Sequence, residues 1–416
     1  MIRRSGSPVL CVLFVLALSA ASSPALAQPS ASQRGFFELR GVEFTQAAPN
    51  DRTREIVDGL FREEVFLRPA PWLQFAAGLD VRGNSHDQVE DEWRLDFSDR
   101  GIRRPRMAVR RLAATITAGH LTIDAGKQFI RWARADILNP TDRFAPRDFL
   151  NVIDTDFLPV LGVRPSLQFG TETIEGVWVP RFTPSRLPLI DQRWTVLPPA
   201  AQGIRILDGG AVLPDDPQIG VRWRHAGRFE AALSFYDGFN NLPNIDVRPL
   251  SLDSVELVRT YPELRSFGAD VAIPTSWFTL KGETAYLKSP DRLNNDYVLY
   301  VVEIERQTGE WLLDGGYAGE VVTNDRGVFR FGADEGLAHS LIGRAAYTVD
   351  PRRTVAIEGA VKENGDGFYV KGEFSESFGQ HVRLTLFGVG LGGDENDFLG
   401  QYHRNSHVAA SLRISF

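Results

Sequence analysis

The last nine residues of the chain, Val408 to Phe416, alternate between apolar side chains and small or charged ones. Neighbouring side chains of a β-strand point to opposite faces, so this stretch predicts a strand with one apolar and one polar face. The same pattern recurs along most of the chain, whose hydrophobic residues (43%) are dispersed rather than gathered. After residue 27 there is no run of about 18 apolar residues, so no transmembrane helix is expected. Such a chain can lie in a membrane only as a closed barrel, which pairs every backbone group.

The amino terminus predicts export from the cytoplasm. Arg3 and Arg4 form a basic start, Val9 to Ala21 is an apolar segment too short to span a bilayer, and Ala25-Leu26-Ala27 is a small-x-small cleavage site. We therefore expect residues 1–27 to be a Sec signal peptide and residues 28–416 to form one domain. The single cysteine, Cys11, lies in the signal peptide, so the mature chain has no disulfide.

The alternating stretches predict about 16 to 18 strands, the larger number including two weakly patterned ones, 166–172 and 174–182. The predicted strands are Phe36–Gln46, Leu60–Arg68, Trp72–Arg82, Met107–Ala118, Leu121–Ile130, Ser166–Glu172, Ile174–Phe182, Ile219–His225, Phe229–Asp237, Phe267–Ile273, Phe278–Lys288, Tyr297–Arg306, Trp311–Val322, His339–Val349, Thr354–Lys362, Phe368–Ser377, Val382–Leu391 and Val408–Phe416.

Short and long connections alternate between these strands. Long loops are expected at about residues 136–165, 183–217 and 238–265, whereas the connections at the other end are tight. The tight turns lie at Pro69, Gly119, Gly227, Pro274, Gly309, Pro351 and Gly379. A soluble β-sandwich would need turns of similar length at both ends. The pattern therefore predicts an all-β, antiparallel up-and-down transmembrane barrel with both termini on the short-turn, periplasmic side.

The width of such a barrel decides which face of each strand is wet. With about 16–18 strands the lumen is too wide for side chains to fill, so the inner face carries the polar residues and the apolar face meets lipid. Val355, Ile357 and Leu384 are then assigned to lipid. Aromatic residues on the apolar face near the short turns, such as Trp311, fit a girdle at the membrane interface. The expected lumen-lining charges are Glu358, Lys362, Lys371, Glu373, Arg383 and Arg413.

One stretch contains a sequence motif in addition to the alternating pattern. Gly126-Lys127-Gln128 leads into Trp132 and then into Asn139-Pro140-Thr141-Asp142, and Glu175-Gly176-Val177-Trp178-Val179-Pro180 follows later. Together these residues resemble an uncharacterised family of porin-like proteobacterial outer-membrane proteins, with a Gly-x-Gln strand, a Trp-Gly pair and an Asn-Pro-x-Asp loop. Here Ala133 replaces the glycine after the tryptophan. The resemblance implies a barrel in the outer membrane of a Gram-negative bacterium rather than a particular substrate.

The loop at 136–165 is rich in charges and restrained by prolines, which fix φ and bias the preceding residue. Long loops of this kind are often functional, and this one is expected to fold into the lumen and constrict it. The alternative is an external lid of weak surface ion pairs. We expect the loop to face the charged wall formed by residues 358–383. Its candidate constriction residues are Arg131, Arg134, Asp136, Asp142, Arg143, Arg147 and Asp148.

Several functions are disfavoured by the sequence. Without the two arginines of the signal peptide the chain has 44 basic and 53 acidic residues, a balance that argues against a nucleic-acid partner. No hydrolase motif of the outer-membrane phospholipase type occurs. His403 and His407 would lie about 13 Å apart on a strand, which is too far for shared metal ligation. The acidic loop Asp394 to Asp397 lacks full EF-hand spacing. We therefore expect no enzyme activity, no cofactor and no resident metal.

The most consistent function is a porin-like channel for diffusion of small solutes. The alternative is a conduit for lipid or hydrophobic compounds that works with a periplasmic or inner-membrane exporter. A third reading is an adhesion or structural barrel with a plugged lumen. The expected partners are outer-membrane lipid, lipopolysaccharide and the barrel-assembly machinery. In outer-membrane barrels, which the carboxyl-terminal strand resembles, a terminal aromatic residue such as Phe416 belongs to the signal that this machinery reads.

Overall fold

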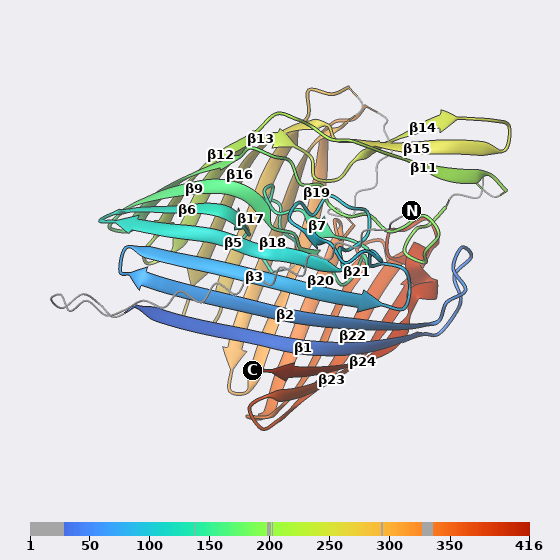
Figure 1. The fold of residues 1–416 in the computed structure, drawn as a ribbon. Coiled ribbons are helices and arrows are strands. Elements are labelled where there is room, and N and C mark those ends of the chain that lie inside the picture. Colours follow the sequence, from blue (N-terminus) through green and yellow to red (C-terminus); the bar gives the residue numbers. More distant parts are fainter. Residues whose placement is uncertain (1–28, 137, 198–200, 202, 293, 327–335) are drawn as a thin grey trace, which may run out of the picture.

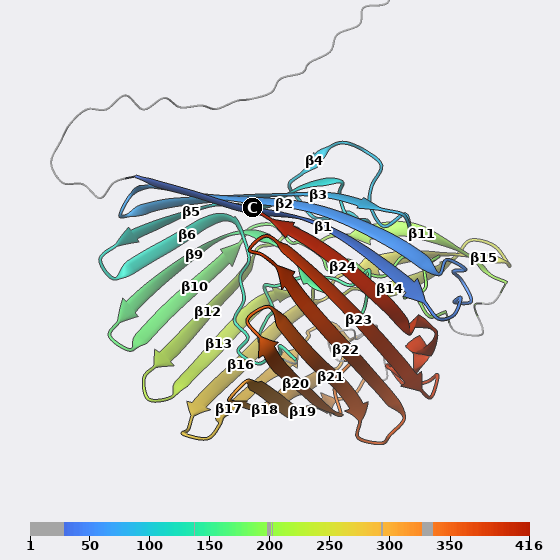
Figure 2. The same ribbon diagram turned by 90° about the horizontal axis from the view of Figure 1, so that it is seen from below.

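The described part of the chain forms a closed antiparallel barrel. The computed structural model describes residues 29–136, 138–197, 201, 203–292, 294–326 and 336–416, so the predicted signal peptide lies outside the described residues. Eighteen strands of this part pair in chain order, and the last pairs with the first. Figures 1 and 2 show the barrel from two directions. The larger predicted strand number is therefore confirmed, and the all-β fold with it.

The barrel strands are long where the alternating pattern is clean. Their bounds are β1 Ser30–Phe44, β2 Glu55–Ala70, β3 Leu73–Asn84, β5 Met107–Ala118, β6 Leu121–Gln128, β9 Val160–Phe169, β10 Glu172–Val179, β12 Gln218–Ala226, β13 Glu230–Phe239, β16 Glu263–Pro274, β17 Thr279–Lys288, β18 Asp296–Thr308, β19 Trp311–Asn324, β20 Ser340–Asp350, β21 Arg353–Lys362, β22 Gly367–Phe378, β23 Val382–Gly393 and β24 His407–Ser415.

Closure joins the two ends of the chain. Strands β1 and β24 pair from Phe36 opposite Ser415 to Phe44 opposite His407. The backbone of Phe416 continues the ladder through two 3.0 Å hydrogen bonds with Gly35. The Phe416 ring also stacks on Phe61 of β2, with the centroids 6.1 Å apart. The terminal residue thus belongs to the seam of the barrel.

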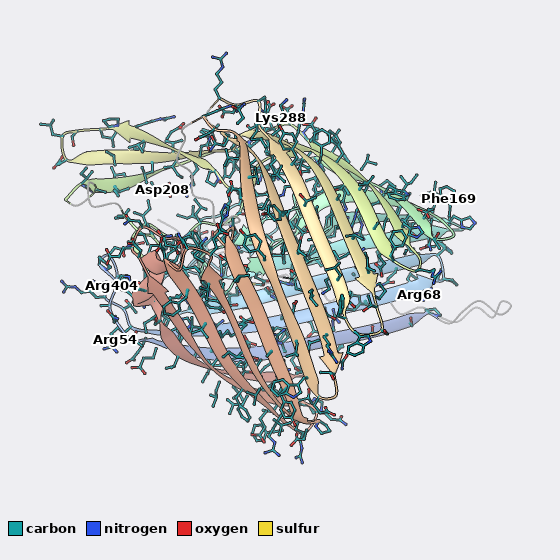
Figure 3. All side chains as sticks on the ribbon, turned by 180° about the vertical axis from the view of Figure 1, so that it is seen from behind. Arg54, Arg68, Phe169, Asp208, Lys288 and Arg404 are labelled. Atoms are coloured by element: carbon teal, nitrogen blue, oxygen red, sulfur yellow. The ribbon has the colours of Figure 1, made fainter. Side chains whose placement is uncertain are left out.

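The two ends of the barrel differ in the length of their connections. At the short-turn end β5 and β6 are joined by two residues, as are β9 and β10, whereas the other end carries the long loops. Figure 3 shows Arg68 and Phe169 at the short-turn end, and Arg54, Lys288, Asp208 and Arg404 at the long-loop end. This asymmetry agrees with the predicted alternation of tight turns and long loops.

The two faces of the barrel wall carry different side chains. Ile357 and Val355 are about half exposed on the outer face of β21, and Leu386 on β23 is exposed as well. The inner face of the same strands carries Glu358, which accepts a 2.8 Å hydrogen bond from the Tyr369 hydroxyl. Rings on the outer face gather near the short turns, namely Trp72, Phe75, Phe169, Phe229, Trp277, Phe278, Trp311, Phe378 and Phe416.

Several strand boundaries differ from the prediction, and one of them changes the bounds of a long loop. The strand predicted at Ser166–Glu172 is β9, Val160–Phe169, so the preceding loop covers residues 129–159 rather than 136–165. Pro165 obscured the strand because proline cannot donate to a β-ladder. It pairs opposite Ile123 of β6 and lies where the β9–β10 ladder is interrupted, between Val163 and Ser166. The proline therefore lies in the strand without breaking the barrel.

Short strands and a 3-10 helix lie within the long connections. Strand β4 (Leu95–Asp96) pairs with the start of β5, and β7 (Arg147–Asp148) pairs with β8 (Asp156–Phe157) inside the loop 129–159. Strands β11 (Arg205–Val212), β14 (Asn244–Pro249) and β15 (Ser254–Thr260) form a separate sheet that projects from the barrel in Figure 1. The predicted loops 183–217 and 238–265 contain these strands. A short 3-10 helix, η2 (Gly400–Asn405), precedes β24. None of the helical segments described is long and apolar enough to cross a bilayer.

Candidate functional site: the loop inside the barrel

The loop 129–159, called the inner loop below, leaves β6 and packs inside the barrel. Its entry depends on Gly126, whose φ of +125° is open to glycine only and whose Cβ would overlap the Leu112 carbonyl. Ile130, Trp132 and Phe144 of the loop are almost fully buried. They form one hydrophobic cluster with inner-face residues of β13, β16, β17 and β18, among them Tyr236, Leu264, Leu287, Tyr297 and Leu299. The loop is thus a packed part of the lumen rather than an external lid.

The residues of the sequence motif hold the start of the inner loop in shape. Asp142 accepts hydrogen bonds from the backbone N–H groups of Trp132 (2.5 Å) and Ala133 (2.7 Å) and pairs with Arg131 at 3.1 Å. The indole N–H of Trp132 donates to Glu175 of β10 at 2.5 Å. Because Asn139 and Asp142 also close a backbone turn around Pro140, the motif forms one connected anchor.

Close packing of the anchor against the wall requires one further glycine. The Trp132 and Phe144 rings meet edge to face, with their centroids 5.1 Å apart. A Cβ on Gly220 of β12 would come within 2.7 Å of atoms in both rings. Only a glycine at this inner-face position lets the two aromatic side chains lie directly on the strand.

Two carboxylates of the wall bind the backbone of the inner loop. Glu283 of β17 accepts hydrogen bonds from the N–H groups of Arg134 (2.8 Å), Ala135 (2.9 Å) and Thr141 (2.9 Å), and from the Thr141 hydroxyl (2.8 Å). Glu303 of β18 accepts the Asp136 N–H at 3.1 Å with both oxygens. Their exposed fractions are 3% and 0%. Buried carboxylates with several N–H donors make strong, directional contacts.

Side-chain ion pairs reinforce the same wall. Arg134 pairs with Asp270 of β16 at 2.7 Å and with Glu230 of β13 at 2.5 Å. Lys281 of β17 reaches Asp136 at 2.5 Å. Asp136, Glu303 and Asp314 each offer a carboxylate oxygen within 4.8 Å of the others, a concentration of negative charge that Lys281 offsets.

The far part of the inner loop contacts the opposite wall. Asp154 pairs with Arg40 of β1, and Asp156 lies 3.6 Å from Arg62 of β2 and 3.2 Å from Arg110 of β5. Strands β2 and β17 are nine strands apart in either direction around the 18-stranded barrel, so they face each other across the lumen. The inner loop therefore spans the lumen from the carboxylate wall to the arginine wall.

A buried ion network joins Asp148 of the inner loop to Arg104 and Arg186, which belong to two other long loops. Asp148 accepts two hydrogen bonds from Arg104, at 2.8 and 3.0 Å, and one from Arg186 at 3.1 Å. Burial opposes the charge on Asp148, but the two guanidinium groups outweigh it and hold the pKa of this carboxyl well below its usual range. Arg186 also bonds Asp99 at 2.9 Å, and Lys127 reaches Asp99 at 2.7 Å.

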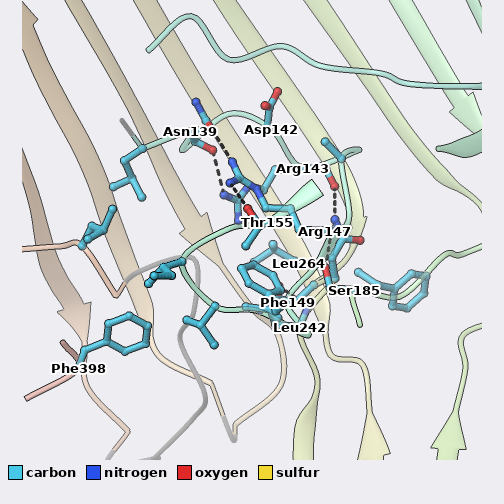
Figure 4. A pocket seen from close by; sticks show the side chains of 18 of the residues that line it. Asn139, Asp142, Arg143, Arg147, Phe149, Thr155, Ser185, Leu242, Leu264 and Phe398 are labelled. Carbon is cyan, nitrogen blue, oxygen red and sulfur yellow. Dashed lines mark hydrogen bonds between the residues drawn. The ribbon is translucent and has the colours of Figure 1, made fainter. Parts of the chain in front are cut away.

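A cavity of about 230 Å³ opens beside the inner loop (Figure 4). Arg147 donates to Asn139 and to Thr155 at its edge, and its guanidinium lies 4.4 Å from the centre of the Phe157 ring. The Arg131 guanidinium lies 4.0 Å from the centre of the same ring. The lining mixes charge with apolar groups, including Arg143, Arg147, Asn139, Ser185, Phe149, Leu242, Leu264 and Phe398.

The structure separates the two groups of charges that the sequence analysis expected to meet. In the part of the chain described, the inner loop bonds to β10, β13, β16, β17 and β18 on one side and to β1, β2 and β5 on the other, and Val152 and Ile153 pack in one cluster with Tyr369 of the residue 358–383 wall. The loop therefore meets that wall through apolar contacts, whereas the charged side chains that were expected to meet it bond elsewhere. On the residue 358–383 wall the charges bond locally: Lys371 pairs with Glu373 at 3.1 Å, Lys362 donates to two backbone carbonyls of the residue 336–338 segment, and Arg383 lies across from Arg413, which pairs with Glu38.

A closed 18-stranded barrel with a long loop packed inside has the architecture of porins. The fold is similar to the crystal structure of a BenF-like porin from Pseudomonas fluorescens Pf-5, with 10% identity, 94% of this chain and 98% of that chain covered, and a TM-score of 0.54. It is also similar to Acinetobacter baumannii OccAB4 (10% identity, 95% and 99% covered, TM-score 0.53) and Pseudomonas aeruginosa OpdQ (10% identity, 94% and 99% covered, TM-score 0.51). No protein-family model and no curated protein sequence matches the chain significantly.

Proposed function

We propose that this protein is an outer-membrane channel through which small hydrophilic solutes diffuse, with the inner loop at its narrowest point. The observation that carries the proposal is the inner loop itself, which crosses the lumen and is fixed to both walls. The outer face of the barrel is apolar, as a lipid-facing band must be, and the inner face carries charges of both signs. An apolar conduit for lipids would need an inner wall of the opposite character.

The location follows from the same reasoning. A barrel with an apolar outer face satisfies its backbone in a bilayer without helices. With the short turns and both termini in the periplasm, the long loops and the small sheet β11–β15–β14 face the outside, beside lipopolysaccharide. Phe416, exposed at the seam, is free to be read by the assembly machinery before closure.

Planar-bilayer recording of the refolded barrel tests the proposal. We expect stepwise ion conductance that increases when the inner loop is loosened. A barrel that is folded by heat-modifiable gel migration but never conducts would overturn it. Neutralising Arg143 and Arg147 together removes positive charge from the wall of the 230 Å³ cavity and should shift ion selectivity toward cations. The matched control neutralises Arg248 and Arg205, which lie on the small projecting sheet.

A further inference from the structure

Four arginines line the inner face of neighbouring strands: Arg40 on β1, Arg62 on β2, Arg82 on β3 and Arg110 on β5. A cleft of about 380 Å³ lies against this wall and is lined by Arg40, Arg62 and Arg82. The side chains of all four arginines are between 16% and 22% exposed, so they are partly covered rather than locked in a core. Such a row of guanidinium groups attracts anions in any aqueous channel.

Carboxylates from two sources face the arginine row: Asp80, Asp58 and Glu38 belong to the wall, and Asp154 and Asp156 belong to the inner loop. Asp80 belongs to the wall itself, is only 5% exposed, and bonds Arg62 at 2.7 Å and Arg82 at 3.0 Å. Asp154 and Asp156 belong to the inner loop, and their side chains are 53% and 46% exposed. Asp80 is therefore a permanent part of the wall, whereas the two loop carboxylates are accessible to the solution in the cleft.

Half-exposed ion pairs are weak and are screened by salt, so they exchange easily with ions in solution. Asp156 illustrates this, because it accepts a 3.2 Å hydrogen bond from Arg110 and lies 3.6 Å from both Arg62 and Arg82, so its charge is shared among three guanidinium groups. The Asp154 side chain pairs with Arg40. The loop carboxylates thus take the places that a passing anion would otherwise occupy.

We propose that Asp154 and Asp156 are built-in, displaceable counter-ions that set the ion selectivity of the channel by neutralising the arginine row. This inference rests on the proposed channel function and identifies which residues tune it. Without the two loop carboxylates, the four arginines face only the carboxylates of the wall, with Asp80 bonded to Arg62 and Arg82. A unit charge about 7 Å from a permeating ion in a water-like medium changes the partitioning of that ion by about threefold.

The first test is the reversal potential in a KCl gradient for the D154N/D156N double variant. We expect the chloride-to-potassium permeability ratio to rise about threefold or more over wild type. The control is D246N/D253N, which removes the same charge from the small sheet and its adjoining turn outside the barrel. Both proteins must show the heat-modifiable migration of folded barrels. A double variant that conducts with the permeability ratio of wild type would overturn the proposal.

A second test does not need ion flow, so it separates this inference from the proposed function. Because residues 28–416 contain no cysteine, Thr155→Cys in the barrel domain places a single thiol between the two carboxylates. Its reaction rates with an anionic sulfonatoethyl and a cationic trimethylammonium-ethyl methanethiosulfonate report the local potential. Adding D154N/D156N should raise the anionic-to-cationic rate ratio about threefold or more, and an unchanged ratio would overturn the counter-ion role. A non-conducting wild type would overturn the channel function while this ratio still decides the role of the carboxylates.

Discussion

Replacing Glu283 by glutamine tests how the inner loop is held. In the native protein one carboxylate oxygen accepts the N–H groups of Arg134 and Ala135, and the other accepts the N–H and the hydroxyl of Thr141. A glutamine has the same shape but keeps only one acceptor oxygen, because its other terminal atom is a donor NH₂ group. If the NH₂ group faces Arg134 and Ala135, two backbone donors are left without an acceptor; if it faces Thr141, the hydroxyl can accept from it and only the Thr141 N–H is left.

The expected cost is worked from those donors. A buried donor left without an acceptor costs about 1–3 kcal/mol, and the favoured orientation of the glutamine leaves one. The loss of loop anchoring is therefore about 2 kcal/mol. That corresponds to a shift on the order of 30-fold in the equilibrium between attached and detached segments. The barrel ladder does not include these bonds, so global unfolding should change little.

Single-channel recording is the assay. Glu283→Gln should show a larger mean conductance and more open-channel noise than wild type, and adding Glu303→Gln should increase both effects. Glu305→Gln is the matched control, because Glu305 lies on the same inner face of β18 and bonds the Lys281 side chain at 2.7 Å rather than the loop backbone. If the Glu283 variant behaves like the Glu305 variant, the carboxylate does not position the inner loop.

Three further predictions concern assembly and the barrel wall. Phe416→Ser should lower the amount of heat-modifiable barrel in the outer membrane while export continues, and normal barrel levels would contradict a role for the terminal ring. Ile357→Arg should destabilise the barrel by about 2–4 kcal/mol in urea titrations in lipid, and Ala356→Arg on the inner face by much less; equal losses would mean that the faces are assigned wrongly. Gly126→Ala should cost about 3 kcal/mol because φ there is +125° and the Leu112 carbonyl leaves no room for a Cβ; an unchanged urea midpoint would refute this.

Strict alternation explains why the wall of the barrel was predictable from the sequence. A shift of one residue would turn every apolar side chain of a strand inward, so strand register and face follow from the pattern alone. Ile357 and Glu358 are neighbours in sequence and lie on opposite faces, as predicted. The β9 strand was misplaced because Pro165 interrupts the pattern, and a local gap in the pairing with β10 that accommodates a proline has no signature in the sequence.

The sequence predicts that the inner loop enters the lumen, but it does not predict which strands the loop packs against. Contacts between distant segments depend on where the loop starts around the barrel. A signal was present nonetheless. From Tyr297 to Val302 strand β18 is apolar on both faces, although only the outer face of a wide barrel meets lipid. Inner-face Tyr297, Leu299 and Val301 are each 1% exposed, since the inner loop covers them. Glu303 ends this stretch and binds the loop backbone. In a barrel of this width, a strand that loses its alternation on the wet face therefore indicates where a loop packs inside.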